Sequence, residues 1–135
     1  MPAIVGQVTN VEQHPESENL DVVTINGKIN VANRPEPNQP RYKVGDYAVV
    51  LEDGLILPEW LLKELDMWDH AKNKGGLAGN KGNRTKGRKI AGVFSEVALY
   101  AAENNNMFKS ENDTFVATLN HDVRELLGIV DYVPA

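Results

Sequence analysis

The alternation of apolar and polar positions predicts short β-strands through most of the chain. Two runs rich in β-branched residues, "LDVVTI" at 20–25 and "KINVA" at 28–32, are separated by Asn26-Gly27. An Asn-Gly pair favours the positive φ angles of a type I′ turn, so this pattern predicts a β-hairpin. Further strands are predicted for "AIVGQVTNVEQ" at 3–13, "YAVVLE" at 47–52, a short "LIL" at 55–57, "VFSEVALY" at 93–100 and "SENDTFVATL" at 110–119.

Two helices interrupt the strand pattern. Pro58 suits a first helical turn, and apolar residues recur at helical spacing from Leu61 to Trp68, which predicts a helix of about ten residues. Near the end of the chain, Asp122 and Glu125 have the spacing of a capping box. Gly128 stands where a short C-terminal helix should end.

This order of elements predicts a mainly β fold. Five short strands, one helix between strands and a short C-terminal helix match a small OB-fold-like Greek-key barrel. At 135 residues the chain is expected to form a single domain spanning 1–135. Apolar residues at 41% and charged residues at 24% are ordinary for a globular protein and do not indicate a disordered or fibrous class.

The composition also limits where the protein works. The chain has no cysteine, which excludes disulfides, thiolate metal sites and cysteine nucleophiles. No apolar run approaches the roughly 18 to 20 residues of a membrane span, and the N-terminus lacks a basic region followed by an apolar one. We therefore expect a soluble, cytoplasmic (intracellular) protein with no membrane partner.

The distribution of charge is strongly uneven. The formal net charge is −5, yet residues 72–92, called the basic segment below, hold seven of the fourteen Lys and Arg residues and no Asp or Glu. Removing these seven positive charges leaves −12 on the rest of the chain. Five glycines lie between Gly75 and Gly87, with few residues to bury, so a mobile surface loop is predicted at about 71–88.

Such a segment predicts contact with a polyanion. Lys and Arg side chains, with backbone amides exposed by glycines, can follow a phosphodiester chain without reading its bases. The alternatives are a solvated loop and a loop that docks on an acidic protein. A phosphate-binding P-loop does not fit, because Gly87 is followed by Arg88-Lys89. The candidate nucleic-acid-binding residues are Lys72, Lys74, Lys81, Arg84, Lys86, Arg88, Lys89 and, for stacking a base, Phe94.

The other candidate chemistry is weaker. Tyr42, Tyr47 and Tyr100 are expected in the core rather than on a stacking platform, whereas Phe94 fits either place. The three histidines have no ligand spacing, and His14 is interpreted as a residue that stabilises a turn. No nucleophile, base and oxyanion set is apparent. We therefore predict no metal, no cofactor and no enzymatic activity.

Four blocks carry a family resemblance. They are "HPESENL" at 14–20, "YKVGDYAVVLEDGLILPEWL" at 42–61, "KIAGVFSE" at 89–96 and "DVRELLGIVDYVP" at 122–134. In this order they resemble the N-terminal OB-fold domain of the RNA ligases typified by the Deinococcus enzyme. More distantly, the chain is similar to the tRNA-binding domains of synthetase-associated proteins. The resemblance spans roughly residues 4–134.

The resemblance implies an accessory role. In these ligases the domain precedes a nucleotidyltransferase domain that supplies an adenylylated lysine in a Lys-x-Asp-Gly motif. The nearest match here is "LEDG" at 51–54, which offers no amine. The resemblance thus implies a non-catalytic module that binds RNA or single-stranded nucleic acid. The alternatives are a protein-interaction or self-assembling module, docking on a ligase or another protein, and a fragment of a complete RNA ligase.

Two positions depart from the family pattern. The family has a positive residue where Ala91 stands and a neutral amide where Glu96 stands. Contacts that the family makes through these positions are therefore not expected here. The charge is instead expected in the longer, more basic loop that precedes them, at Lys81, Arg84, Lys86, Arg88 and Lys89.

Overall fold

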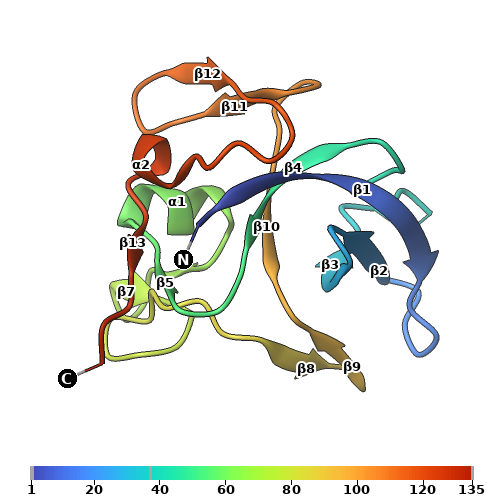
Figure 1. Cartoon of the computed structure of the whole chain (residues 1–135). Coiled ribbons are helices and arrows are strands. Elements are labelled where there is room, and N and C mark those ends of the chain that lie inside the picture. The colour runs from blue at the N-terminus through green and yellow to red at the C-terminus, as the bar shows by residue number, and fades with distance from the viewer. Residues whose placement is uncertain (1, 37, 135) are drawn as a thin grey trace.

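The computed structural model describes residues 2–36 and 38–134 and shows a mainly β fold (Figure 1). Its centre is a five-stranded antiparallel sheet in the order β10-β4-β1-β2-β3, which curls into a half-barrel. These strands are β1 (Ile4–Gln13), β2 (Leu20–Ile25), β3 (Lys28–Asn33), β4 (Tyr47–Leu51) and β10 (Ala98–Ala101). The predicted fold class, with five main strands and two short helices, is confirmed.

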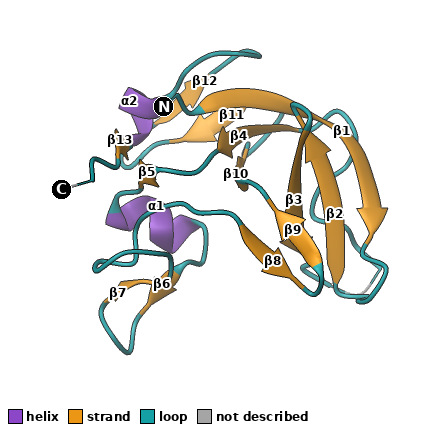
Figure 2. Cartoon of the chain, turned by 60° about the horizontal axis from the view of Figure 1, so that its bottom comes forward, coloured by secondary structure: helices purple, strands orange, loops and turns teal. Residues whose placement is uncertain are grey.

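The remaining elements are short and surround this sheet (Figure 2). Four two-stranded pairs form: β5 with β13, β6 with β7, β8 with β9, and β11 with β12. The strands are β5 (Leu55–Ile56), β6 (Trp68–Asp69), β7 (Lys74–Gly75), β8 (Arg88–Ile90), β9 (Val93–Ser95), β11 (Met107–Lys109), β12 (Thr114–Val116) and β13 (Val130–Asp131). The helices are α1 (Glu59–Glu64) and α2 (Arg124–Leu127). Neither helix is long or apolar enough to cross a membrane, and no other helix occurs among the described residues.

The predicted hairpin between β2 and β3 is confirmed. Asn26 and Gly27 have φ angles of 50° and 71°, as a type I′ turn requires. The neighbouring strand β1 pairs with β4 through its first half and with β2 through its second half. Its register shifts between Val8 and Asn10, and such a bulge increases the local twist of a strand. This change of partner along one strand curls the sheet.

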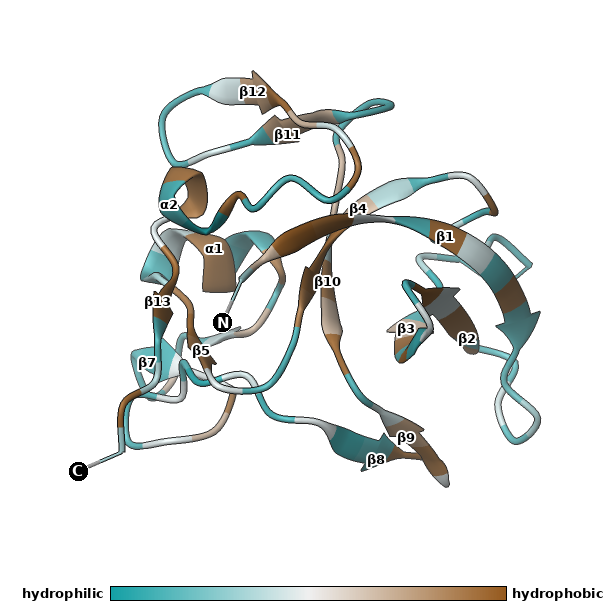
Figure 3. Ribbon diagram, viewed as in Figure 1, coloured by the Kyte–Doolittle hydropathy of each residue, from teal (hydrophilic) through white to brown (hydrophobic). Residues whose placement is uncertain are grey.

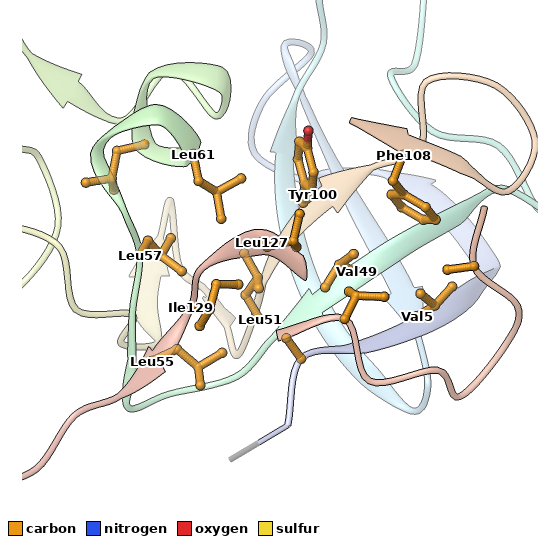
Figure 4. Packing of buried hydrophobic residues seen from close by; sticks show 14 residues of the cluster. Val5, Val49, Leu51, Leu55, Leu57, Leu61, Tyr100, Phe108, Leu127 and Ile129 are labelled. Carbon is orange, nitrogen blue, oxygen red and sulfur yellow. The ribbon is translucent and has the colours of Figure 1, made fainter. Parts of the chain in front are cut away.

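The core lies on both faces of β4. Val49 and Leu51 belong to a cluster that includes Leu61 of α1 and Leu127 of α2 (Figure 4). Ala48 and Val50 belong to a second cluster, inside the curl of the sheet. Successive side chains of a strand point to opposite faces, so a strand buried on both sides is apolar without alternation. The hydropathy colouring shows this apolar band through β4 and β10 (Figure 3).

Helix α1 is shorter than the ten residues predicted. It ends at Glu64, and Asp66 takes a φ angle of 57°, in the left-handed region. The backbone N–H of Met67 then donates to the carbonyl of Leu62 at 2.7 Å. Trp68, expected on the helix, lies instead in β6. The position of Trp68 fits the helical spacing of apolar residues, but the chain has already left the helix at Leu65.

Other predicted boundaries also changed. The segment 93–100 forms two strands, β9 and β10, rather than one, and β12 pairs with a strand, β11, that was not predicted. The C-terminal helix ends at Gly128 in the left-handed conformation, as predicted. No side-chain bond caps α2 at Val123. Asp122 Oδ1 accepts from the backbone N–H groups of Ala3 at 3.2 Å and Arg124 at 3.1 Å. Asp122 thus binds a first-turn N–H as predicted, but no reciprocal bond from Glu125 is found among the described residues.

Most of the predicted loop at about 71–88 has no regular secondary structure, but several contacts join the basic segment to the body of the protein. The segment contains β7 and β8, and Thr85 within it is buried. The Thr85 hydroxyl accepts from the N–H of Leu55 at 2.9 Å and donates to the carbonyl of Glu52 at 2.6 Å. The glycine content predicted a mobile loop. Composition alone, however, does not show which backbone groups have hydrogen-bond partners.

Candidate nucleic-acid interface

Side chains attach the β8–β9 hairpin to the free edge of β3. The N–H of Ile29 donates to Glu96 Oε2 at 2.9 Å, and the N–H of Val31 donates to Ser95 Oγ at 3.0 Å. The Asn30 side-chain amide donates to the carbonyl of Val97 at 2.8 Å. Glu96, which departs from the family pattern, therefore closes the half-barrel on this side. The hairpin is thus held in a fixed position.

The pairing within the hairpin sorts its side chains between two faces. Lys89 is opposite Phe94, and Arg88 is opposite Ser95. Directly opposed residues of an antiparallel pair share a face. Because Ser95 is buried against β3, Arg88 lies on the face that looks toward the sheet, whereas Lys89 and Phe94 share the outer face.

Phe94 is held on this outer face by the chain below it. Its side chain is 52% exposed, although a buried position is usual for so large an apolar residue. A Cβ atom on Gly87 would lie only 2.8 Å from Phe94 Cζ, so the ring lies against the bare backbone of Gly87. Phe94 thus contacts the segment between Lys86 and Arg88, with about half of its surface open to a ligand.

A groove runs beside the hairpin. Arg88 and Ile90 line one part of it, and Arg41 and Tyr42 line another, around a volume of about 340 Å³. Lys86 and Arg88 also line a smaller adjoining hollow of about 80 Å³. Two acidic residues at and just after the end of α1, Glu64 and Asp66, also line the larger groove, so its charge is mixed.

The seven cations of the basic segment have no carboxylate partner within the part of the chain that the structure describes. Among the described residues, 2–36 and 38–134, the ion pairs on record join other lysines and arginines to acidic groups. Arg34, for example, lies 2.8 Å from the carboxylate of the buried Asp21. The segment therefore packs against the body of the protein without neutralising its charge there. This leaves its positive charge available to an external anion.

Glycine amides do not form a phosphate cradle here, contrary to the prediction. Four of them donate within the protein: Gly75 to the carbonyl of Lys81, Gly76 to that of Met67, Gly82 to that of Gly79, and Gly87 to Asp53 Oδ1. Instead, the backbones of Gly75 and Gly82 pass so closely that a Cβ on either would collide with the carbonyl of the other. Close packing therefore explains these glycines.

The eight predicted residues fall in three places. Four of them lie on the β8–β9 hairpin or just before it, Arg88 on its inner face and Lys89 and Phe94 on its outer face. We call Lys86, Arg88, Lys89 and Phe94 the hairpin site. Lys74 and Lys81 line a separate pocket near Trp68, and Lys72 is exposed nearby. Arg84 is directed elsewhere, because its Cζ lies 4.4 Å from the ring centroid of Tyr132. The sequence could not sort these residues, because the segment folds back on itself.

The tyrosines expected in the core are found there. Tyr42 and Tyr100 are buried, and Tyr47 packs partly against the same core. The Tyr100 hydroxyl donates to the carbonyl of Lys109 at 2.7 Å, and burial raises the pKa of Tyr100 to about 12. Burial also raises the pKa of Tyr42. These two rings are therefore not available to stack on a base.

His14 stabilises a turn, as predicted. Its Nδ1 accepts from the N–H of Glu16 at 2.9 Å, and its Nε2 lies 3.3 Å from the carbonyl of Ile90. With Nδ1 accepting, the proton of the neutral ring belongs on Nε2, which donates to Ile90. His14 is buried, and it fixes the end of β8 to the turn after β1. No group of three His, Asp or Glu residues suited to a metal ion occurs among the described residues.

Sequence reasoning did not include Arg41, which lies across the groove from the hairpin. Its Cζ is 5.9 Å from the Tyr42 ring centroid, and the residue is exposed. A signal was present, because Arg34 and Arg41 flank the proline-rich loop "RPEPNQPR". Only Arg41 is a candidate for contact, because Arg34 is bound to Asp21.

Comparison with known proteins gives structural neighbours only. No protein-family model matches the chain, and no curated protein matches it. Solved structures that match include those of an RNA ligase from Naegleria gruberi. Its complex with PPi has a TM-score of 0.68 at 19% identity, covering 98% of this chain and 35% of the ligase chain. A mutant with ATP and Mn gives a TM-score of 0.69 at 18% identity, covering 98% and 36%.

These likenesses define the class of fold. The chain is a curled β domain of the kind found in about a third of an RNA ligase chain. At this identity the match shows the fold and not the activity. The chain spans about a third of the length of the ligase chains that it resembles. The sequence blocks and the structural neighbours thus agree on the class of fold.

Proposed function

We propose that this chain is a non-catalytic module that binds RNA or another single-stranded nucleic acid. The observation that carries the proposal is the hairpin site. Its three cations have no carboxylate partner among the described residues, and its phenylalanine is half exposed, on one anchored hairpin beside a groove. The likeness to part of an RNA ligase supports RNA as the ligand. In this proposal the chain is an accessory domain that binds the RNA substrate of a ligase. It acts inside the cell.

The chemistry of the hairpin site fits a single strand. Lys86 and Arg88 would hold phosphate at the small hollow that they line, and Lys89 would hold phosphate on the outer face, where the open part of Phe94 would stack on a base. Every base has an aromatic face, so such a site binds without sequence preference. The charge of −12 on the rest of the chain would repel a strand elsewhere and confine it to this face.

The OB-fold description belongs to the same proposal. An OB-fold is a five-stranded, partly open Greek-key barrel that binds oligonucleotides on its strands and loops. The strand order of the half-barrel and its closure between β3 and the residues around Ser95 support this description. The groove beside Arg88 lies along that closure.

The test is the affinity for a fluorescently labelled single-stranded RNA, measured by anisotropy at several salt concentrations. For single strands, the slope of log K against log salt is about −0.7 per phosphate neutralised. The variant K86A/R88A/K89A should therefore bind more weakly, and its slope should be shallower by about 2. The control K28A/K43A/K109A removes the same charge from the body and should bind almost as wild type does. Equal binding by wild type and the hairpin variant would remove the site from the proposal.

A second candidate is a protein-interaction or self-assembling module. Exposed apolar residues near the end of the described chain favour it: Leu126 is 49% exposed, Val130 57% and Val133 81%. In this alternative the chain docks on a catalytic ligase domain or on a copy of itself. Size-exclusion chromatography with light scattering, with and without RNA, separates the two candidates. The reading frame after codon 135 shows whether the chain is part of a longer ligase.

A further inference from the structure

A second pocket lies at the β6–β7 hairpin, on the side of α1 away from the curled sheet (Figure 2). Its volume is about 290 Å³, and we call it the Trp68 pocket. The polar and aromatic side chains that line it come from four short segments of the chain. They are Glu59, Trp68, Asn73, Lys74, Asn80, Lys81 and Asn83.

The backbone around this pocket is fixed. Trp68 pairs with Gly75 in the β6–β7 ladder, and the N–H of Gly75 donates to the carbonyl of Lys81 at 3.0 Å. Gly75 and Gly82 are in backbone contact that no larger residue would allow. Lys74 and Lys81 therefore start from adjoining segments whose separation cannot vary much. Trp68 packs partly against the core that includes Leu62, which holds the ring at the wall of the pocket.

The lining holds two lysines and one carboxylate, and that carboxylate is paired with a lysine outside the lining. Lys74 and Lys81 are exposed, and neither has an ion-pair partner among the described residues. Glu59 contributes a carboxylate to the lining, but it lies 2.9 Å from the ammonium of Lys63. That ammonium also lies 5.2 Å from the centroid of the Trp68 ring. A bound anion would therefore meet two lysines whose charge is not already satisfied.

The asparagines add both hydrogen-bond donors and acceptors, whereas an inorganic anion such as phosphate needs donors. Each side-chain amide offers two donors and one acceptor, which matches the edge of a base or the hydroxyls of a sugar. An indole ring beside them offers a flat surface for stacking. A volume near 300 Å³ is at the lower limit of small-molecule pockets, which fits one nucleotide and not a longer strand.

We propose that the Trp68 pocket binds one nucleoside monophosphate, either a free mononucleotide or the phosphorylated end of an RNA strand. Lys74 and Lys81 hold the phosphate, Trp68 stacks against the base, and the three asparagine amides contact the base or sugar. This site is distinct from the hairpin site and does not depend on it. Its residues were predicted only in part, because Trp68 was assigned to the helix.

The test is a titration of isotope-labelled protein with AMP, observed at the Trp68 indole and the asparagine side-chain amides by NMR, with affinity from calorimetry. AMP should bind at least tenfold more tightly than adenosine or inorganic phosphate, because each of these lacks part of the contact. The variant K74A/K81A should weaken AMP binding at least tenfold. The control K72A removes an exposed lysine nearby that does not line the pocket, and its affinity should stay within twofold of wild type.

Further comparisons show whether the ligand is a strand end or a free mononucleotide, and whether the Trp68 pocket and the hairpin site are independent. If an RNA with a 5′-phosphate shifts the Trp68 indole and the same RNA with a 5′-hydroxyl does not, the ligand is a strand end. If AMP alone shifts it, the ligand is a free mononucleotide. The variant K86A/R88A/K89A should keep AMP binding even where it loses RNA binding. The proposal is overturned if AMP causes no shift at the indole, if K72A and K74A/K81A weaken binding equally, or if inorganic phosphate binds as tightly as AMP.

Discussion

The ring of Phe94 rests on Gly87, a residue whose missing side chain makes room for it. An added Cβ would lie 2.8 Å from Cζ and 2.9 Å from Cε1 of the ring. This contact fixes an aromatic surface between Lys86 and Arg88 while leaving half of it exposed. The glycine therefore supports the hairpin site through shape rather than through its own amide, which donates to Asp53.

Replacing Phe94 by alanine should weaken RNA binding with little effect on folding. Stacking of a base on an aromatic side chain contributes about 1–3 kcal/mol. Because the ring is half exposed, its removal should change the free energy of unfolding far less than removal of a core residue such as Phe108. RNA anisotropy and urea denaturation of F94A and F108A measure the two effects. A strongly destabilised F94A with unchanged RNA affinity would assign Phe94 to packing alone.

Adding a methyl group at Gly75 should destabilise the protein. The new Cβ would collide with the backbone of Gly82, which cannot move as a side-chain end could. Overpacking of this kind typically costs about 1–3 kcal/mol. The matched control is G76A, because a Cβ at Gly76 would have its nearest contact at 3.4 Å, with the carbonyl of Met67. Urea denaturation should show a loss of stability for G75A that exceeds the loss for G76A.

Breaking the ion pair between Asp21 and Arg34 should be costly. Asp21 is 2% exposed, and its Oδ1 accepts from Arg34 Nε at 3.0 Å and Nη2 at 2.8 Å. Removing one partner of a buried pair leaves the other charge uncompensated, at a cost of about 3–5 kcal/mol. The control is E52A, which removes the exposed partner of Lys28 and should cost about 1 kcal/mol or less. Equal thermal stability of D21A and E52A would contradict this account.

Tyr100 should make the fold sensitive to alkaline pH. Burial raises its pKa from 10.0 in the unfolded chain to about 12 in the folded protein. The unfolded state therefore loses the proton first, and the contribution of Tyr100 to stability is complete below pH 10 and lost as pH rises to about 12. Stability curves of wild type and Y100F between pH 8 and 12 should converge as pH rises. A constant difference across this range would show that Tyr100 does not titrate abnormally.

The sequence by itself determined the local structure of this protein. Asn26-Gly27 specified a hairpin, the unbroken apolar run of β4 specified a strand buried on both faces, and Gly128 specified the end of α2. These features depend on φ preferences and side-chain periods that act over a few residues. The ordered motifs of the four family blocks also indicated the fold class that the structure shows.

Only the tertiary structure decided how the basic segment is arranged. Its seven cations look equivalent in the sequence, yet the crossing of Gly75 and Gly82 places Lys74 and Lys81 beside Trp68. The pairing of β8 with β9 places Lys89 beside Phe94 and Arg88 on the opposite face. The glycines that suggested mobility allow close backbone packing instead. Contacts between residues distant in the chain decide these groupings, and no local pattern of charge or spacing records them.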